Sequence, residues 1–302
     1  MRIALAGASG FIGTALTAAL IARGDDVTVF VRPDSTRAPA DAIRWDPARG
    51  LLDDADVRRV GPLDAIVNLA GAGIGDRRWS DERKALLRSS RLASTTLIVD
   101  SLQALGASTL INGSAIGYYG SRGDETLDES SSPGEDFLAQ LCRDWEAAAS
   151  RAPRDVRVCH LRSGIVLDAA GGALRRQLPL FRLGLGGRLG SGAQWLSPIS
   201  LVDEVRAILW ILDARLEGPV NLVAPQPLTN AQFTRVLARA LGRPAALAVP
   251  RAALTLALGR GLAEGAILAS QRVLPRRLLE SGFTFGQSDA TAIVATALAR
   301  TN

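Results

Sequence analysis

Apolar residues in the first half of the chain occur in short continuous runs that are separated by segments with helical spacing. The first run covers residues 3–6, and later runs cover 27–31, 42–46, 65–71, 109–112, 156–161 and 163–167. Short continuous apolar runs are typical of strands buried on both faces of a parallel sheet, with helices as the connections between them. The pattern therefore predicts an α/β fold with a doubly wound parallel sheet.

Helical spacing dominates beyond the last of these runs. Between the strands of the first half, long helices are expected at 80–103 and 135–151. In the second half, one strand-like run at 220–223 is surrounded by helical segments at 173–182, 203–214, 230–241, 250–262 and 289–300. We therefore expect a first domain over 1–222, in which 168–202 contributes to the substrate side, and a small, mostly helical C-terminal lobe over 223–302.

Three glycines, Gly7, Gly10 and Gly13, fall where the first strand passes into the first helix. Glycines allow a backbone to approach a pyrophosphate closely, and the free N–H groups at a helix start favour its charge. The spacing differs from the commoner G-x-G-x-x-G, so an ordinary glycine-rich turn is the alternative. The position of the loop, between an N-terminal strand and a helix, favours a dinucleotide site.

The second strand ends at Val31 and is followed by Arg32, Pro33 and Asp34. In a dinucleotide-binding sheet, an acidic residue at this point binds the ribose 2′-hydroxyl of NAD, whereas an arginine suits the 2′-phosphate of NADP. Arg32 lies at the strand tip and Asp34 two residues further on, so the sequence favours NADP(H) over NAD(H). The alternative is an exposed arginine in a turn.

Composition excludes several classes of protein. The chain has 302 residues, 47% hydrophobic and 22% charged, as in a globular protein. It contains no apolar run of membrane-spanning length, and because residues 2–6 already have the pattern of a strand, we expect no signal peptide. Two cysteines make neither a disulfide framework nor a zinc cluster, so we expect a reducing cytoplasm.

The basic charge does not indicate a nucleic-acid partner. The net charge is +5, but the arginines are spread along the chain and aromatic residues are only 5%. The single histidine, His160, lies inside a strand-like run, so we expect no metal site and no serine–histidine hydrolase. A small-molecule substrate is the expected partner, without nucleic acid or membrane, and a homodimer is compatible with this expectation.

Hydroxyl groups follow the fifth strand, in the segment Ser114-Ala115-Ile116-Gly117-Tyr118-Tyr119. A serine and a tyrosine at the carboxyl edge of the sheet are the groups needed to move a proton on a hydroxyl during hydride transfer. Ser114, Tyr118 and Tyr119 are therefore the candidate catalytic residues. The alternative is that one tyrosine packs under the loop and the other is exposed.

These motifs resemble the extended short-chain dehydrogenase/reductases and, more narrowly, their YfcH-like epimerase family, over nearly the whole chain. The N-terminal motifs are Gly-Ala-Ser-Gly-Phe-Ile-Gly at 7–13, Asn-Leu-Ala-Gly at 68–71, Arg78-Trp79 and Ser90-Arg91. Further motifs are Gly-Ser-Ala-Ile-Gly-Tyr-Tyr-Gly at 113–120, Leu141-Cys142, Trp145-Glu146, Leu161-Arg162-Ser163-Gly164, Phe-Arg-Leu-Gly-Leu-Gly-Gly at 181–187, Gly-Ser-Gly at 190–192 and Pro225 through Phe233.

The resemblance implies a Rossmann fold, bound NADP(H) and a C-terminal lobe over the substrate side. Carried over by position, the glycine loop would hold the pyrophosphate and Arg32, next to Val31, the 2′-phosphate. Ser114 would face the nicotinamide, with Val166 nearby, and Arg91 would face the cofactor. The other implied cofactor contacts are Gly7, Ser9, Gly10, Phe11, Ile12, Gly13, Leu69, Ala70 and Gly71.

The chain departs from the superfamily at its most important pair. Active members carry Tyr-x-x-x-Lys on the helix after strand five, but residues 137–146 contain neither tyrosine nor lysine, and Lys84 is the only lysine. Cys142 lies at or near the position of the missing lysine, and Ser200 replaces a histidine common in the family. Two functions stay open: an NADP(H)-dependent oxidoreductase or epimerase-like enzyme for a small hydroxyl or carbonyl compound, and a non-catalytic NADPH-binding sensor.

Overall fold

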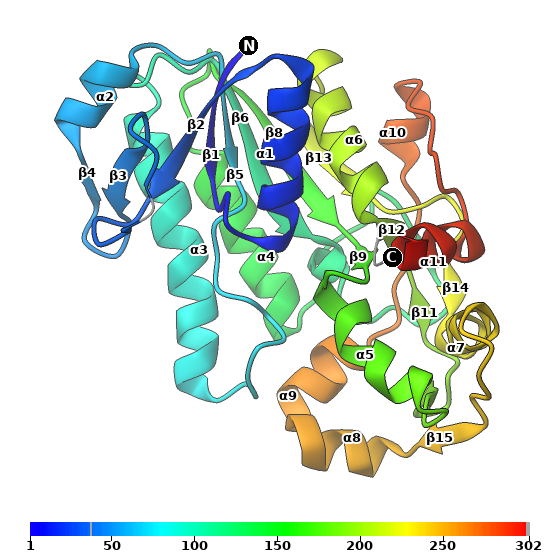
Figure 1. The fold of residues 1–302 in the computed structure, drawn as a ribbon. Coiled ribbons are helices and arrows are strands. Elements are labelled where there is room, and N and C mark those ends of the chain that lie inside the picture. Colours follow the sequence, from blue (N-terminus) through cyan, green and yellow to red (C-terminus); the bar gives the residue numbers. More distant parts are fainter. Residues whose placement is uncertain (37, 300–302) are drawn as a thin grey trace.

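An eight-stranded, mostly parallel sheet forms the centre of the larger part of the molecule, and its strands come from residues 2–222 (Figure 1). The computed structural model describes residues 1–36 and 38–299. Across the sheet the order is β13-β8-β6-β5-β1-β2-β3-β4, and only the last pair is antiparallel. The strands are β1 (Arg2–Ala6), β2 (Asp26–Val31), β3 (Ile43–Asp46), β4 (Leu51–Leu52), β5 (Ala65–Asn68), β6 (Thr109–Ala115), β8 (Arg157–Ser163) and β13 (Gly218–Leu222).

Strand order reverses between β1 and β5, which confirms the predicted doubly wound sheet of a Rossmann fold. In such sheets ligands bind outside the carboxyl ends of the strands at this switch point. The predicted glycine loop follows β1, and the segment 69–71 follows β5. The fold therefore places two of the predicted cofactor segments side by side.

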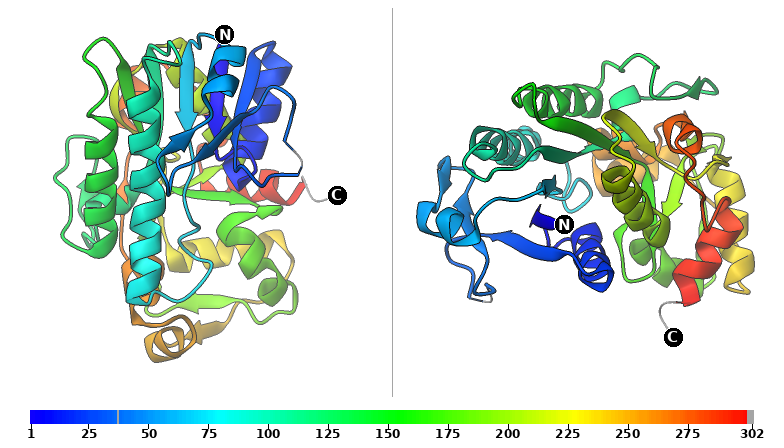
Figure 2. Two further views of the ribbon diagram at one scale, coloured as in Figure 1. Left: turned by 90° about the vertical axis from the view of Figure 1, so that its left-hand side faces the viewer. Right: turned by 90° about the horizontal axis from the view of Figure 1, so that it is seen from above.

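Helices cover both faces of the sheet (Figure 2). On one face, Ile3 and Leu5 of β1 pack into a core with α1 (Phe11–Arg23) and α6 (Leu201–Asp213). On the other face, Ala4 and Ala6 join a core with α3 (Asp81–Ser101), and α2 (Asp54–Val60) and α4 (Phe137–Ala149) also contribute to it. This alternation along β1 is the two-residue period of a strand, with both faces buried as the apolar run predicts.

The C-terminal half has its own core, formed by residues between Leu167 and Ala297. The helices α5 (Gly172–Arg182), α7 (Asn230–Ala240) and α11 (Ala290–Ala299) contribute to this core. The same part of the chain also contains α8 (Arg251–Leu258), α9 (Arg260–Leu262) and α10 (Arg276–Glu280). Short strand pairs connect them: β9 (Ile165–Asp168) with β12 (Pro198–Ser200), β10 (Gly187–Leu189) with β15 (Leu247–Val249), β11 (Trp195–Leu196) with β14 (Leu228–Thr229), and β7 (Thr126–Leu127) with β16 (Arg272–Val273).

The predicted strands and long helices are confirmed, with end points shifted by a few residues. The helix predicted over 80–103 is α3, and the one predicted over 135–151 is α4. The short strand pairs of the C-terminal half were not predicted, because two- and three-residue strands leave no periodicity. Residues 165–182 pack in the same core as the lobe, and the boundary at residue 222 stays a prediction.

Candidate functional site

Close backbone contacts around the loop after β1 require glycine at two of its positions. Gly7 has a φ of +85°, and a Cβ on it would lie 2.8 Å from the carbonyl carbon and oxygen of Leu69. A Cβ on Gly13 would lie 2.1 Å from the carbonyl oxygen of Gly7. Both contacts are shorter than real side chains allow, so the close approach of β1, α1 and the segment after β5 needs glycine at these positions.

The start of α1 has the properties of an anion site. Gly10 is the N-cap and offers no side chain to the first free N–H groups, and no acidic residue stands in the first turn. Ser9 and Gly10 are exposed. Unpaired N–H groups and the positive end of a 13-residue helix therefore face outward beside the loop. These features fit the pyrophosphate of a dinucleotide.

Phe11 and Ile12 have packing roles in addition to their place in the loop. A Cβ on Gly171 would lie 2.3 Å from the ring of Phe11, so this ring is seated directly against the turn that opens α5. Ile12 packs against the core between the sheet and α6, as does Val166 of β9. Their predicted cofactor contacts stay predictions, whereas their contacts with the C-terminal half are part of the structure.

Arg32 extends from the tip of β2, just after the half-buried Val31. Its side chain is 55% exposed, and Nη1 lies 3.3 Å from Oδ1 of Asp46. The same carboxylate is also 3.6 Å from Nε of Arg49. Exposed ion pairs of this kind contribute little free energy, so the Arg32 guanidinium is available to a phosphate group.

A buried polar cluster fixes the segment after β5, where Leu69, Ala70 and Gly71 were predicted to contact the cofactor. The Asn68 amide donates to Oγ1 of Thr95 at 3.0 Å and to Oδ1 of Asn112 at 2.8 Å. The side-chain oxygen of Asn68, Oδ1, accepts a hydrogen bond from the backbone N–H of Ala70 at 3.2 Å. This cluster was not predicted from the sequence, although Asn68 and Asn112 each end an apolar strand-like run and so gave a signal for it.

Arg91 reaches the sheet edge from α3. Nη1 donates to the carbonyl oxygens of Ala72 and Leu87 at 3.0 and 3.1 Å, and the guanidinium carbon lies 5.0 Å from the ring of Trp145. Burial lowers the pKa of Arg91 to about 10. The structure thus places a buried cation at the position where the resemblance implies a cofactor contact.

A cavity of about 310 Å³ lies beyond the carboxyl ends of β6 and β8. Arg91 and Ser114 line it, together with Cys142 of α4, whereas Tyr118, Tyr119 and Val166 do not. The other lining residues are Ile74, Ala115, Ile116, Gly117, Leu138, Leu141, Trp145, Ser163, Gly164, Ile165, Trp195, Leu196, Ser197, Gly265, Ala266, Ala269 and Gln271.

Ser114 is held by a buried ion pair. Its hydroxyl donates to Oε1 of Glu146 at 2.6 Å. Arg162 of β8 donates to both oxygens of this carboxylate, from Nε and Nη2, each at 2.8 Å. Because Ser114 has only one hydrogen to donate, its oxygen presents lone pairs to any other partner. No role was predicted for Glu146 and Arg162 from the sequence. A single charged residue within an otherwise apolar segment was the feature that could have indicated one.

The two tyrosines serve this ion pair rather than the cavity. Tyr119 is fully buried, and its hydroxyl donates to Oδ1 of Asn221 at 2.7 Å and accepts from Nη1 of Arg162 at 3.0 Å. Burial raises the pKa of Tyr119 to about 12. The guanidinium carbon of Arg162 lies 3.5 Å from the ring centre of Tyr118. A 3₁₀ turn over Ile116–Tyr119 produces this arrangement, since its first two residues line the cavity and its last two stack on Arg162.

Cys142 is the second protic group on the cavity wall. Burial raises the pKa of its thiol to about 12, so the group is a neutral thiol at physiological pH. Cys142 and Cys159 are both buried and unpaired. In the part of the chain that the structure describes, no group of three or more His, Cys, Asp and Glu side chains could hold a metal ion.

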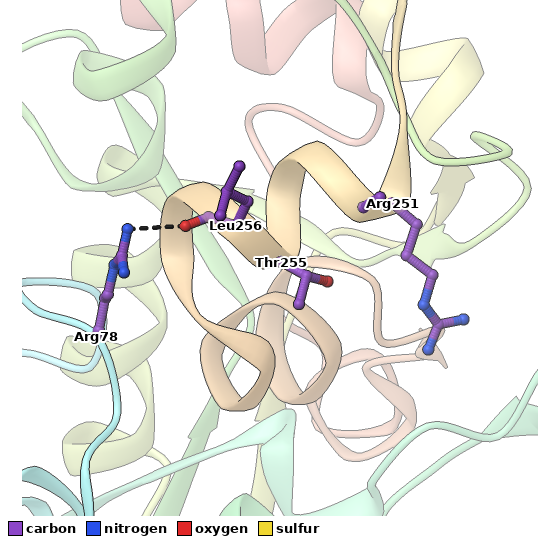
Figure 3. A pocket seen from close by; sticks show the side chains of 5 residues that line it. Arg78, Arg251, Thr255 and Leu256 are labelled. Atoms are coloured by element: carbon purple, nitrogen blue, oxygen red, sulfur yellow. Dashed lines mark hydrogen bonds between the residues drawn. The ribbon is translucent and has the colours of Figure 1, made fainter.

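A second hollow of about 760 Å³ opens on the outer surface beside α8 (Figure 3). Arg78 donates to the carbonyl oxygens of Leu256 and Ala257 at 2.8 and 3.0 Å and so satisfies the end of this helix. Arg251, Ala252 and Thr255 complete the lining. None of the predicted site residues lines it, so we place the candidate site in the smaller cavity.

Comparison with known proteins identifies the family. Residues 3–223 match the model of the NAD dependent epimerase/dehydratase family. The chain belongs to this family. A domain of unknown function, DUF1731, matches residues 249–295 and therefore includes the segment 265–271, which contributes to the cavity wall. The resemblance inferred from the sequence motifs is confirmed.

Relatives in the epimerase family match nearly end to end. The chain is 47% identical over 287 residues to the epimerase family protein Mb2239 of Mycobacterium bovis, covering 94% of this chain and 93% of that protein. It is 37% identical over 293 residues to human epimerase family protein SDR39U1, covering 94% and 95%.

Solved structures show the same fold. Human SDR39U1 in complex with NADPH superimposes with a TM-score of 0.88 at 36% identity, covering 98% of this chain and 99% of that one. The UDP-glucose 4-epimerase of Thermus thermophilus, in complex with NAD, has a TM-score of 0.76 at 20% identity and covers 99% of both chains, which shows the fold alone. No helix in the described residues combines the length and hydropathy needed to cross a bilayer.

Proposed function

We propose that the chain is an NADP(H)-dependent oxidoreductase or epimerase-like enzyme that acts on a small hydroxyl- or carbonyl-bearing molecule. One observation carries the proposal: the free start of α1, Arg32 and the cavity around Ser114 all lie at the carboxyl edge of one sheet. The NADPH in the structure of a 36% identical relative supports the choice of cofactor.

In this proposal the cofactor lies along the carboxyl edge of the sheet. The loop from Gly7 to Gly13 holds the pyrophosphate, Arg32 holds the 2′-phosphate, and the segment 69–71 lines the adenosine ribose side. Arg91 and Val166 face the nicotinamide half. When bound, NADP(H) supplies hydride exchange with the substrate carbon.

Ser114 positions the substrate oxygen in this proposal. Its hydrogen is directed to Glu146, so its oxygen accepts a hydrogen bond from a substrate hydroxyl. The bidentate contact from Arg162 keeps the Glu146 carboxylate fixed, which fixes Ser114 in turn. Tyr118 and Tyr119 stabilise this pair from the other side, and the proposal gives them no contact with the substrate.

The same tyrosines favour a second candidate function, a non-catalytic NADPH-binding protein that senses redox state or binds another protein. Tyr119 is buried and hydrogen-bonded to structural partners, neither tyrosine lines the cavity, and α4 carries no Tyr-x-x-x-Lys pair.

For either function we propose a cytoplasmic location, since both cysteines are buried thiols.

Variant kinetics separate the two functions. For an enzyme, Ser114→Ala lowers kcat/KM by at least tenfold and leaves the dissociation constant of NADPH within twofold, because Ser114 acts on the substrate. Ser89→Ala on the exposed side of α3 is the matched control and changes neither. Tight NADPH binding without turnover across a broad panel of carbonyl compounds and sugar nucleotides contradicts the enzyme and supports the sensor.

A further inference from the structure

The composition of the cavity narrows the substrate class, and the argument rests on the proposed function. The walls are dominated by aliphatic and aromatic side chains from both halves of the chain. They include Ile116, Leu138, Leu141, Trp145, Trp195 and Leu196. Apolar walls of this kind stabilise a ligand by removing its apolar surface from water and offer no compensation for the desolvation of charges.

Charge is nearly absent from these walls. Arg91 is the one charged side chain among the described residues that line the cavity. Two of its hydrogen bonds already go to backbone carbonyls, its guanidinium lies over Trp145, and the proposed function assigns it to the cofactor. Arg272 lies with its guanidinium carbon 4.4 Å from the ring of Trp195, but it is not among the lining residues. A substrate diphosphate between these walls would therefore be desolvated without a second cation among the residues that line them, which is unfavourable.

The hydroxyl and amide side chains on the walls have their hydrogens committed. Ser114 donates to Glu146, and the hydroxyl of Ser197 donates to the carbonyl oxygen of Gln271 at 2.8 Å. The amide of Gln271 donates to the carbonyl oxygens of Ile116 and Gly120 at 3.0 and 3.2 Å. What remains for a ligand at Ser114 is an acceptor, which matches one hydroxyl hydrogen rather than the many polar groups of a sugar.

The volume of the cavity also favours a small substrate. The cavity volume of about 310 Å³ lies at the low end of the roughly 300–1,000 Å³ that is usual for small-molecule sites. The nicotinamide ring has to enter the same space to reach a substrate at Ser114. Gly265, Ala266 and Ala269 form one wall from the C-terminal half, and their small side chains are what keeps this volume open.

We infer that the substrate is a compact, uncharged and largely apolar alcohol, or the corresponding ketone or aldehyde, and that nucleotide sugars are not substrates. In the oxidative direction the alcohol hydroxyl donates a hydrogen bond to the oxygen of Ser114. As hydride leaves the substrate carbon for NADP⁺, the hydroxyl proton passes to Ser114 while the proton of Ser114 passes to Glu146 and from there to solvent, which gives the carbonyl compound, NADPH and H⁺. In the reductive direction, the same atoms return in reverse.

The test uses the purified full chain saturated with NADP⁺, after its affinity for the cofactor has been measured separately. Probes are 1-phenylethanol and cyclohexanol against UDP-glucose and UDP-galactose, with ligand binding followed by thermal shift and by tryptophan fluorescence, since Trp145 and Trp195 line the cavity. Formation of NADPH is followed at the same time. We expect the apolar alcohols to bind at least tenfold more tightly than the nucleotide sugars.

A cavity-filling variant locates the binding. Ala266→Phe places a ring in the cavity and is expected to weaken 1-phenylethanol at least tenfold at saturating NADP⁺. The NADPH affinity of the variant is measured separately, because the nicotinamide ring shares this space. Ala253→Phe, at an exposed position of α8 outside the cavity, is the matched control and changes neither affinity.

Other results would contradict either the inferred substrate class or the proposed function. Binding or epimerisation of UDP-glucose overturns the inference, and so does intact NADPH affinity without binding of either alcohol. Unchanged 1-phenylethanol affinity in Ala266→Phe also overturns it. Failure to bind NADPH is a different result, since it removes the proposed function itself.

Discussion

At the residue scale, we propose that Arg32 determines the choice between the two pyridine nucleotides. Its guanidinium is 55% exposed and has only a weak partner in Asp46, so a phosphate can replace that partner. Arg32→Glu removes one cation and adds an anion beside the 2′-phosphate. We expect the NADPH dissociation constant to rise at least tenfold, about 1.4 kcal/mol, while that of NADH changes less than threefold.

Arg49→Glu is the matched control, because Arg49 is 77% exposed and contacts the same carboxylate of Asp46. It should leave both affinities within threefold. An equal loss of NADPH and NADH affinity in Arg32→Glu would place the 2′-phosphate at another site.

Glu204 makes stability depend on pH. The side chain is fully buried, its Oε1 accepts the Ser163 hydroxyl at 2.5 Å, and Oε2 has no hydrogen-bond partner among the described residues. Burial raises the pKa of Glu204 to about 8, above its ordinary value of 4.5. The folded chain holds this proton more tightly than the unfolded chain, so stability is highest below pH 4.5 for this group and falls as the pH rises toward 8.

Glu204→Gln is uncharged at every pH and removes this contribution. We expect the free energy of unfolding of wild type to fall relative to the variant by up to about 1.4 kcal/mol per pH unit between pH 5 and 8. Urea titrations across this interval measure it, with the exposed Glu280→Gln as control. Parallel curves for wild type and Glu204→Gln would show that the carboxyl group is charged when folded.

At the scale of elements, the junction of β1, α1 and the segment after β5 depends on glycine. A methyl group on Gly13 meets the Gly7 carbonyl oxygen at 2.1 Å, so Gly13→Ala has to displace α1 from β1. We expect a destabilisation of more than about 2 kcal/mol together with loss of NADPH binding. Thermal melts with and without NADPH measure both effects.

Gly24→Ala is the control that distinguishes the steric effect of the close contact at Gly13 from the effect of backbone strain alone. Gly24 has a positive φ of +88°, unlike Gly13, but a Cβ there meets nothing within 4 Å. Its replacement should cost about 1 kcal/mol and leave NADPH affinity unchanged. A similar loss of affinity in both variants would contradict the role of the loop.

The pair of Glu146 and Arg162 connects α4 to β8 beneath Ser114. Removing one partner of a buried ion pair leaves the other charge uncompensated, so Arg162→Ala should destabilise the chain by about 3–5 kcal/mol. Arg176→Ala removes a pair whose arginine is 59% exposed and should cost less than about 1 kcal/mol. Denaturant unfolding of both variants gives the comparison, and equal costs would contradict a buried, charged pair.

At the scale of the whole molecule, local patterns predicted the sheet, the glycine loop and the place of Ser114. Each depends on neighbours in sequence: the apolar run of β1, the spacing of Gly7 and Gly13, and the end of a strand. The partners of Ser114 were not predictable in this way. Glu146 lies 32 residues away and belongs to another element, so only the packing of α4 on the sheet brings it to the serine.

For the two tyrosines, the sequence predicted the position in the chain but not the direction of the side chains. Sequence position placed Tyr118 and Tyr119 correctly just after β6, but the side to which each ring turns is set by the 3₁₀ turn and by Arg162 of β8. The cavity likewise combines the edge of the sheet with the segment 265–271, more than 100 residues further along the chain. No local periodicity contains that information.

The central claim is that one dinucleotide binds across this sheet edge, with its 2′-phosphate at Arg32. Isothermal titration of the wild-type chain with NADPH and with NADH tests it most directly. The account predicts a single site per chain that binds NADPH more tightly than NADH. The absence of binding heat for both nucleotides, with the chain folded, would contradict it.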